Sequence, residues 1–105
     1  MERTELPFLS VTELARQIEK KQISPVEVVE AYLERIERLD PQLNAYLSVC
    51  QDEARQAARD AEDAVARGHY RGLLHGIPFA AKDQLYTKGL RTTGGSPIFA
   101  HFVRF

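Results

Sequence analysis

The chain has 105 residues, of which 44% are hydrophobic and 28% charged, a composition typical of a globular protein and not of a disordered one. Its 14 basic and 15 acidic residues leave a net charge of −1, so charge provides no drive toward nucleic acid or membrane partners. The single cysteine excludes an intrachain disulfide, and with no apolar run of about 20 residues we expect a cytoplasmic protein without membrane spans.

The first predicted elements are two helices that form a helical hairpin over residues 10–39. Ser10 and Glu13 have the spacing of a capping box, in which each side chain bonds the other's free backbone N–H. The second helix begins at Ser24 and Pro25, because proline at the first helical position loses no hydrogen bond there. Apolar residues recur along both segments with helical spacing.

We expect the second helix to end at residue 39, because Asp40 precedes Pro41 and a residue before proline resists the helical conformation. On the exposed side of the same helix, Glu34 and Arg38 have the i, i+4 spacing of an ion pair.

The next stretch predicts a βαβ unit over residues 44–82. Residues 44–50 and 77–82 are candidate strands, and residues 52–67 between them are a candidate helix with alanines along one face. Such a connection is right-handed and joins parallel strands, so the predicted fold class is α/β. Because sites in open α/β sheets gather beyond the carboxyl ends of strands, the residue at the end of the second strand, Lys82, is a candidate site residue.

Lys82 is the main candidate for chemistry. A free lysine has a pKa of about 10.4 and is protonated at neutral pH, but burial can lower that pKa by several units and release a basic amine. The apolar run before Lys82 would favour such burial. The alternative is a solvated lysine that extends into water, the commoner situation for this residue type.

A set of motifs surrounds this lysine. Gly76-Ile77-Pro78 precedes Lys82-Asp83, and Thr92-Thr93 followed by Gly95-Ser96 comes after it. In this order and spacing they resemble the amidase signature family, whose members share G-I-P-x-x-x-K-D and then T-T-x-G-S. The resemblance implies a mixed-sheet α/β/α fold and hydrolysis of amide C–N bonds by a Ser–cis-Ser–Lys triad, with Lys82 as the triad lysine.

Ser96 follows two glycines, like the nucleophile segment of that family, but it stands where the family has its T-T-x-G-S loop. We therefore expect a structural turn at Ser96 and both triad serines outside residues 1–105. Asp83 would raise the pKa of a neighbouring lysine, so we expect a structural role for it. His75 precedes Gly76 in a predicted turn, and no spacing of His, Cys or Asp indicates a metal site or a cofactor.

The resemblance makes residues 1–105 the N-terminal part of one amidase domain, with residues 83–105 as a loop leading to the remainder. We expect the chain to be inactive alone, to take a small-molecule amide as substrate in the complete enzyme, and to self-associate through an exposed strand edge. Two alternatives stay open: the A subunit of the tRNA-dependent amidotransferase, and a non-enzymatic α/β interaction module that binds a partner through its helical hairpin.

Overall fold

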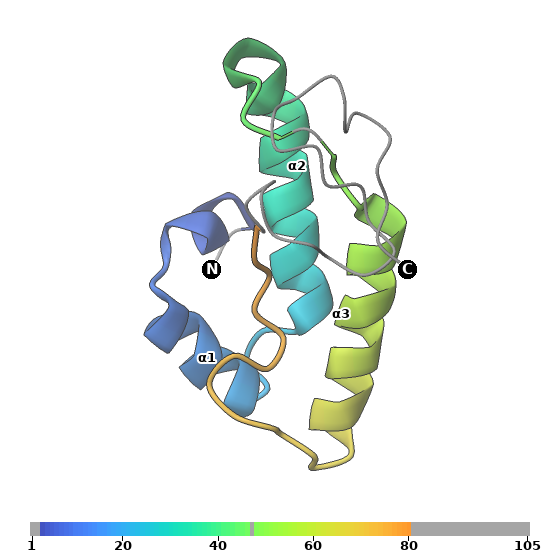
Figure 1. The fold of residues 1–105 in the computed structure, drawn as a ribbon. Coiled ribbons are helices and arrows are strands. Elements are labelled where there is room, and N and C mark those ends of the chain that lie inside the picture. Colours follow the sequence, from blue (N-terminus) through green and yellow to red (C-terminus); the bar gives the residue numbers. More distant parts are fainter. Residues whose placement is uncertain (1–2, 47, 81–105) are drawn as a thin grey trace. The chain divides into compact units, whose positions relative to one another are not determined.

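The computed structural model describes residues 3–46 and 48–80 (Figure 1). These residues belong to two compact units. The first contains residues 3–45 and 50–78, and the described part of the second is residues 46, 48, 49, 79 and 80. The elements below all lie in the first unit.

The described part of the chain is helical. In chain order its elements are η1 (Arg3–Phe8), a 3-10 helix, followed by α1 (Val11–Glu19), α2 (Pro25–Leu43) and α3 (Gln51–Ala66). The three α-helices were predicted from the sequence, whereas η1 was not.

The predicted βαβ unit over residues 44–82 is wrong, and with it the α/β fold class. Within residues 3–46 and 48–80 no strand forms, and the described parts of both candidate strands, 44–50 and 77–82, have irregular backbone. A strand depends on hydrogen bonds to a neighbouring strand, and a unit with only two strands is marginally stable in water. The apolar pattern of these segments predicted burial, but it could not supply the partner that a strand requires.

The helix starts are as the sequence predicts. The hydroxyl of Ser10 accepts a hydrogen bond from the Glu13 N–H at 3.1 Å, and the hydroxyl of Ser24 accepts one from the Glu27 N–H at 3.1 Å. Each bond satisfies a donor that the first helical turn leaves unpaired. The carboxylate of Glu13 accepts from the side chains of Arg16 and Gln17, each at 3.0 Å, and not from the Ser10 N–H, so only one half of the predicted capping box forms.

Helix α2 does not end at residue 39 but continues through Pro41 to Leu43. The reason is a strong C-terminal cap. Asn44 adopts the left-handed conformation and its N–H donates to the Asp40 carbonyl at 2.7 Å, while the Asp40 carboxylate accepts from the Ala45 N–H at 2.7 Å. These bonds outweigh the reluctance of a residue before proline to be helical.

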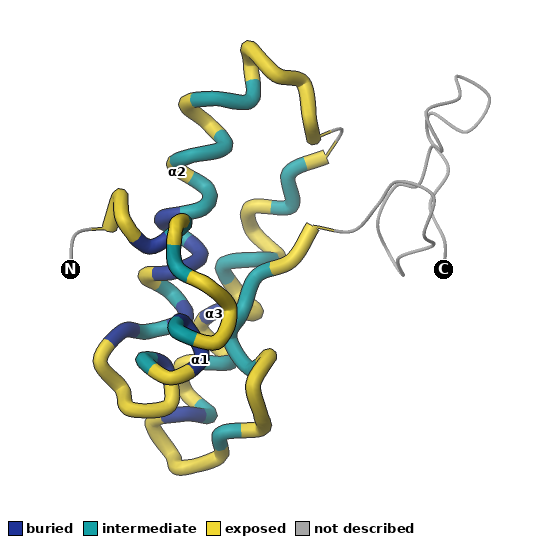
Figure 2. The backbone as a smooth tube through the Cα atoms, turned by 90° about the vertical axis from the view of Figure 1, so that its left-hand side faces the viewer, coloured by how far each residue is buried: buried dark blue, intermediate teal, exposed yellow. Residues whose placement is uncertain are grey.

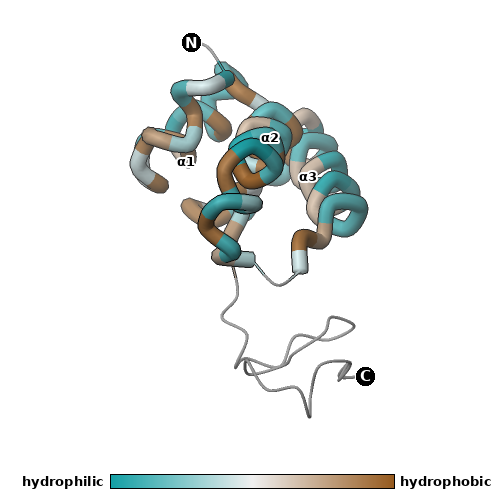
Figure 3. The backbone as a smooth tube through the Cα atoms, turned by 90° about the horizontal axis from the view of Figure 1, so that it is seen from above, coloured by the Kyte–Doolittle hydropathy of each residue, from teal (hydrophilic) through white to brown (hydrophobic). Residues whose placement is uncertain are grey.

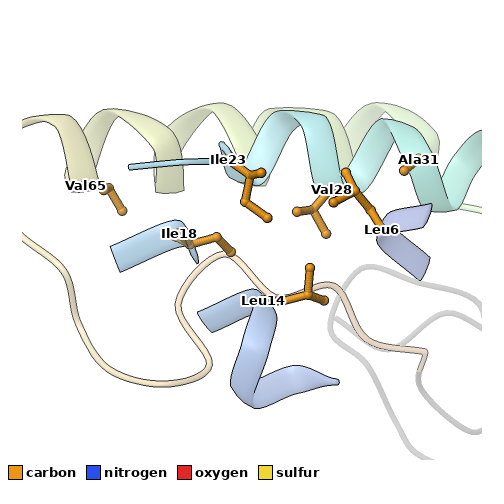
Figure 4. Close-up of a cluster of buried hydrophobic side chains, with 7 residues drawn as sticks. All are labelled: Leu6, Leu14, Ile18, Ile23, Val28, Ala31 and Val65. Carbon is orange, nitrogen blue, oxygen red and sulfur yellow. The ribbon is translucent and has the colours of Figure 1, made fainter. Parts of the chain in front are cut away.

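A cluster of seven buried apolar side chains connects all four helical elements (Figure 4). Its members are Leu6, Leu14, Ile18, Ile23, Val28, Ala31 and Val65. Buried residues concentrate in α1 and the first turns of α2, whereas the last turns of α2 are exposed (Figure 2). Hydrophilic and hydrophobic residues alternate along each helix, as expected for helices with one apolar face (Figure 3).

Helix α2 packs chiefly against α3 and η1. The guanidinium of Arg55 on α3 donates to the Glu30 carboxylate on α2, with Nε–Oε1 and Nη2–Oε2 distances of 2.6 and 3.4 Å. Arg3 on η1 pairs with Glu34 at 2.7 Å, so the predicted pairing of Glu34 with Arg38 is wrong. Sequence spacing could not reveal this competing partner, because Arg3 lies 31 residues away.

Candidate functional site

The structure describes the segment that leads to the predicted catalytic lysine, but not the lysine itself. Lys82, Asp83 and Ser96 lie outside the described residues, so their roles stay predictions. The described part of the motif is residues 76–80, and His75 directly precedes it. We call residues 71–78 the approach segment; Figure 1 draws it in gold to orange after α3.

The approach segment contains the turn that the sequence predicts at His75. The His75 N–H donates to the Gly72 carbonyl at 3.0 Å, and the Ile77 N–H donates to the Leu74 carbonyl at 3.1 Å. These two successive turn bonds give the segment a defined local conformation, although it is not a strand.

The imidazole of His75 ties the approach segment to helix α3. Its Nε2 lies 2.9 Å from the carbonyl oxygen of Ala61, in the interior of α3. Its Nδ1 lies 3.4 Å from the backbone nitrogen of Arg71, which donates to it. The half-buried ring therefore uses both nitrogens in bonds to backbone.

Gly76 presses the approach segment against the first turn of α2. Its φ is +79°, a conformation that side chains other than hydrogen disfavour. A Cβ added there would lie 2.7 Å from Cγ of Pro25 and 3.5 Å from Cδ1 of Ile18. The first glycine of the motif is thus required both by the backbone turn and by close packing on α1 and α2.

Ile77 and Tyr70 extend this attachment into the core, since both pack against the buried apolar cluster. The Tyr70 hydroxyl is buried and has no hydrogen-bond partner among the described residues. Burial raises the pKa of the Tyr70 phenol, and the negative charge of Glu19 raises it further. Tyr70 also contacts the His75 ring, with 5.7 Å between ring centroids.

A small hollow in the helical unit shares no lining residue with these contacts. This hollow of about 30 Å³ beside η1 and α2 is lined by Arg3, Glu34, Arg35 and others, and has room for one or two water molecules. In residues 3–46 and 48–80, no group of three His, Cys, Asp or Glu side chains is placed to hold a metal ion. No described helix combines the length and apolar character needed to cross a membrane.

Sequence reasoning identified the motif but missed what holds it. It placed His75 in a turn without a function for its ring, and the bond to Ala61 bridges 14 positions of sequence. The only local feature of the sequence that could have drawn attention to His75 was its place directly before a glycine and an apolar run. The α/β fold assumed for the non-enzymatic interaction module is wrong, because the described residues form no βαβ unit, whereas partner binding through the helical hairpin stays a prediction.

The comparisons with known proteins support the family resemblance that the motif indicated. The family model named Amidase matches residues 27–105. The chain is 48% identical over 94 residues to the "Putative amidase AmiD" of Mycobacterium tuberculosis, an alignment covering 90% of this chain and 20% of that protein.

Two other relatives are the A subunits of Glutamyl-tRNA(Gln) amidotransferases. The one from Aromatoleum aromaticum is 47% identical over 94 residues, covering 90% of this chain and 19% of that protein. The one from Carboxydothermus hydrogenoformans is 39% identical over 99 residues, covering 94% and 20%. The chain thus spans about one fifth of the length of these curated relatives. No solved structure matches it significantly.

Proposed function

We propose that this chain, which belongs to the amidase family, is part of an enzyme that hydrolyses the C–N bond of small-molecule carboxylic amides. The observation that carries the proposal is the family match over residues 27–105, because it includes Lys82 and the motifs on both sides of it. The 48% identity to the "Putative amidase AmiD" over 90% of the chain supports the same reaction class.

In this proposal Lys82 acts as the base of a Ser–cis-Ser–Lys triad. The neutral amine accepts a proton from a bridging serine, which in turn takes the proton of the nucleophilic serine. The serine oxygen then forms a bond to the amide carbonyl carbon, the C–N bond breaks, and the amine leaves with a proton returned along the same path. Water hydrolyses the resulting ester and restores the serine.

Both serines of the triad lie beyond residues 1–105 in this scheme, and Ser96 has a structural role. We therefore expect the 105-residue chain to hydrolyse no amide by itself, since a base without a nucleophile completes no acyl transfer. The cytoplasmic location predicted from composition is part of the same proposal.

The test is a pair of substitutions at Lys82 in the full-length protein that carries this chain. Lys82→Ala should lower kcat far more than it raises KM, because the amine moves protons and does not hold substrate. Lys82→Arg should not restore kcat, since a guanidinium stays protonated at any working pH.

Ser96→Ala is the matched control, and an acylating inhibitor with mass spectrometry identifies the nucleophile. The inhibitor should label a serine beyond residue 105 in both the wild type and the Ser96→Ala variant. Label on Ser96 itself, or near-normal kcat in Lys82→Ala, would overturn the proposed assignment.

A second candidate function is that of the A subunit of an amidotransferase, favoured by the 47% identity to the Aromatoleum aromaticum protein. The two functions differ in what the active site needs. A simple amidase should release ammonia or amine from small amides when assayed alone, whereas the amidotransferase should require the aminoacylated tRNA that its name specifies. Assays of the full-length protein with small amides, and with glutamine plus glutamyl-tRNA, separate them.

A further inference from the structure

We propose that the hollow beside η1 and α2 is a binding site for a small organic carboxylate. The hollow has a volume of about 30 Å³, and all its described lining residues belong to the helical unit. Its charged lining residues are three arginines and one glutamate: Arg3, Arg35, Arg38 and Glu34. The chain as a whole has a net charge of −1, so this local excess of positive charge favours an anionic ligand. The proposal is independent of the proposed amide hydrolysis.

Two of the three arginines are open to such a ligand. The Arg3 guanidinium already donates to the Glu34 carboxylate at 2.7 Å. Among the described residues, the guanidinium groups of Arg35 and Arg38 have no hydrogen-bond or ion-pair partner. These two residues lie three positions apart on α2, so they are neighbours on the helix surface and their like charges repel. A bound carboxylate would offset that repulsion.

The acidic residues of α2 do not neutralise this pair. Of the acidic residues on η1 and α2, only Glu34 lines the hollow, and it is paired with Arg3. Glu30 pairs with Arg55 on α3. The negative charge of Glu37 also raises the pKa of Arg55, which places Glu37 near α3. The positive charge of Arg35 and Arg38 at the hollow therefore stays uncompensated by these carboxylates.

Phe8 restrains one of the two guanidinium groups. Cζ of Arg35 lies 4.7 Å from the centroid of the Phe8 ring, a cation–π contact. An arginine restrained in this way presents a planar set of N–H donors that matches the two oxygens of a carboxylate. Phe8 itself is 73% exposed, so it also offers apolar surface beside the guanidinium. A ligand with an apolar group next to its carboxylate would contact both residues.

The size of the hollow favours a carboxylate over a phosphate or sulfate. A volume of about 30 Å³ has room for two oxygen atoms of the size of water, and a carboxylate has two. A phosphate or sulfate has four oxygens, so part of the group would remain outside the hollow. The class of ligand that fits both the hollow and Phe8 is therefore an aryl or alkyl carboxylic acid.

Sodium benzoate is the probe for this site, and benzamide is its neutral control. The arginine Nε–H signals of the 105-residue chain are followed by NMR at constant ionic strength. We expect benzoate to shift the Arg35 and Arg38 signals saturably with a Kd in the millimolar range, the usual strength for so small a ligand. Benzamide should leave these signals unchanged. Shifts that do not saturate, equal shifts with benzamide, or equally tight binding of inorganic phosphate would overturn the proposal.

Arg38→Gln and Arg59→Gln are a matched pair of variants. Each removes one positive charge from an exposed arginine, but only Arg38 lines the hollow. Arg38→Gln should weaken benzoate binding about tenfold, the effect of losing one hydrogen bond between charged groups. Arg59→Gln should weaken it less than about twofold. Equal weakening in the two variants would mean that benzoate responds to net charge alone, and would overturn the proposal.

Arg35→Lys tests the geometry of the site, because it keeps the positive charge but not the planar set of donors. It should weaken benzoate binding about tenfold, and unchanged binding would contradict the role of Arg35. Circular dichroism checks that every variant keeps its helices. If the 105-residue chain does not fold alone, equilibrium dialysis of benzoate with the full-length protein decides. The difference between Arg38→Gln and Arg59→Gln then separates this site from binding elsewhere in the enzyme.

Discussion

Leu14 and Ile18 of α1 are almost fully buried, whereas Leu73 and Leu74 of the approach segment are 68% and 74% exposed. Both regions belong to the same unit, but different contacts hold them. The helices are held by apolar area removed from water, which is non-directional and summed over many side chains. The approach segment contains no fully buried residue and depends on contacts at His75, Gly76 and Ile77.

Because different contacts hold the two regions, substitutions in them should have different effects. A change in the helical core should alter whether the unit folds, while a change in the approach segment should alter where the motif before Lys82 is held. Because few contacts hold the segment, single substitutions there can displace it without unfolding the helices. The four predictions below test that separation.

The largest expected effect is that of Ile18→Ala in the helical core. Ile18 is fully buried, and removing a buried isoleucine side chain leaves a cavity that costs about 2–5 kcal/mol of unfolding free energy. Val11→Ala on the same helix is the control, since Val11 is 48% exposed and should lose about 0.5 kcal/mol or less. Urea unfolding of both variants measures this, and similar midpoints would show that the α1 core does not support the unit.

Gly76→Ala should cost about 2 kcal/mol, the largest loss in the approach segment. A left-handed conformation costs about 1–2 kcal/mol in alanine, and here the added Cβ also meets Pro25 at 2.7 Å. Gly68→Ala is a matched control, because Gly68 has φ +82° but open space around its Cβ. The difference between the two unfolding free energies measures the clash, and equal losses would mean that the segment does not press on α2.

The ion pair between Glu30 and Arg55 predicts a smaller, pH-dependent effect. The hydrogen bond from Arg55 lowers the pKa of the Glu30 carboxyl below its ordinary value of 4.5, and the Arg55 charge lowers it further. Since the folded-state pKa is the lower one, the stabilisation is present above pH 4.5 and is lost as pH falls through the folded-state pKa.

Thermal unfolding of Glu30→Gln across this pH range tests the assignment. The wild type should melt at a higher temperature than Glu30→Gln above pH 4.5, and the two curves should converge in more acidic solution. Glu62→Gln, at an exposed glutamate of α3, is the control and should show no such convergence. A wild-type advantage that grows on acidification would contradict the ion pair's role.

Leu74→Ala should have the smallest effect, within about 0.5 kcal/mol, because the side chain is 74% exposed. Ile77→Ala, three residues later, should lose about 1–2 kcal/mol because Ile77 packs against the core while remaining half-buried. Unfolding free energies of the two variants test whether the segment is attached at Ile77 alone or along its length. A larger loss of unfolding free energy in Leu74→Ala than in Ile77→Ala would contradict this, because it would mean that the segment is attached at Leu74 and not at Ile77.

Sequence alone determined the three α-helices, because their signals are local. Caps at Ser10 and Ser24 and the periodic apolar residues act within a few positions of each other, and the structure contains the bonds to both serine hydroxyls. The motif around Lys82 was also readable, and the family match over residues 27–105 confirms the recognition it led to. Self-association of the chain stays a prediction, but the strand edge on which it was based does not form among the described residues.

Tertiary structure decided every feature that depends on a partner distant in sequence. Within residues 3–46 and 48–80 the segments predicted as strands have no ladder to join, and Glu34 bonds Arg3 in place of Arg38. His75 finds its acceptor at Ala61, a carbonyl that no residue pattern marks. Sequence patterns report which side chains favour burial or a helical turn, whereas a hydrogen bond across elements depends on where folding places both of its atoms.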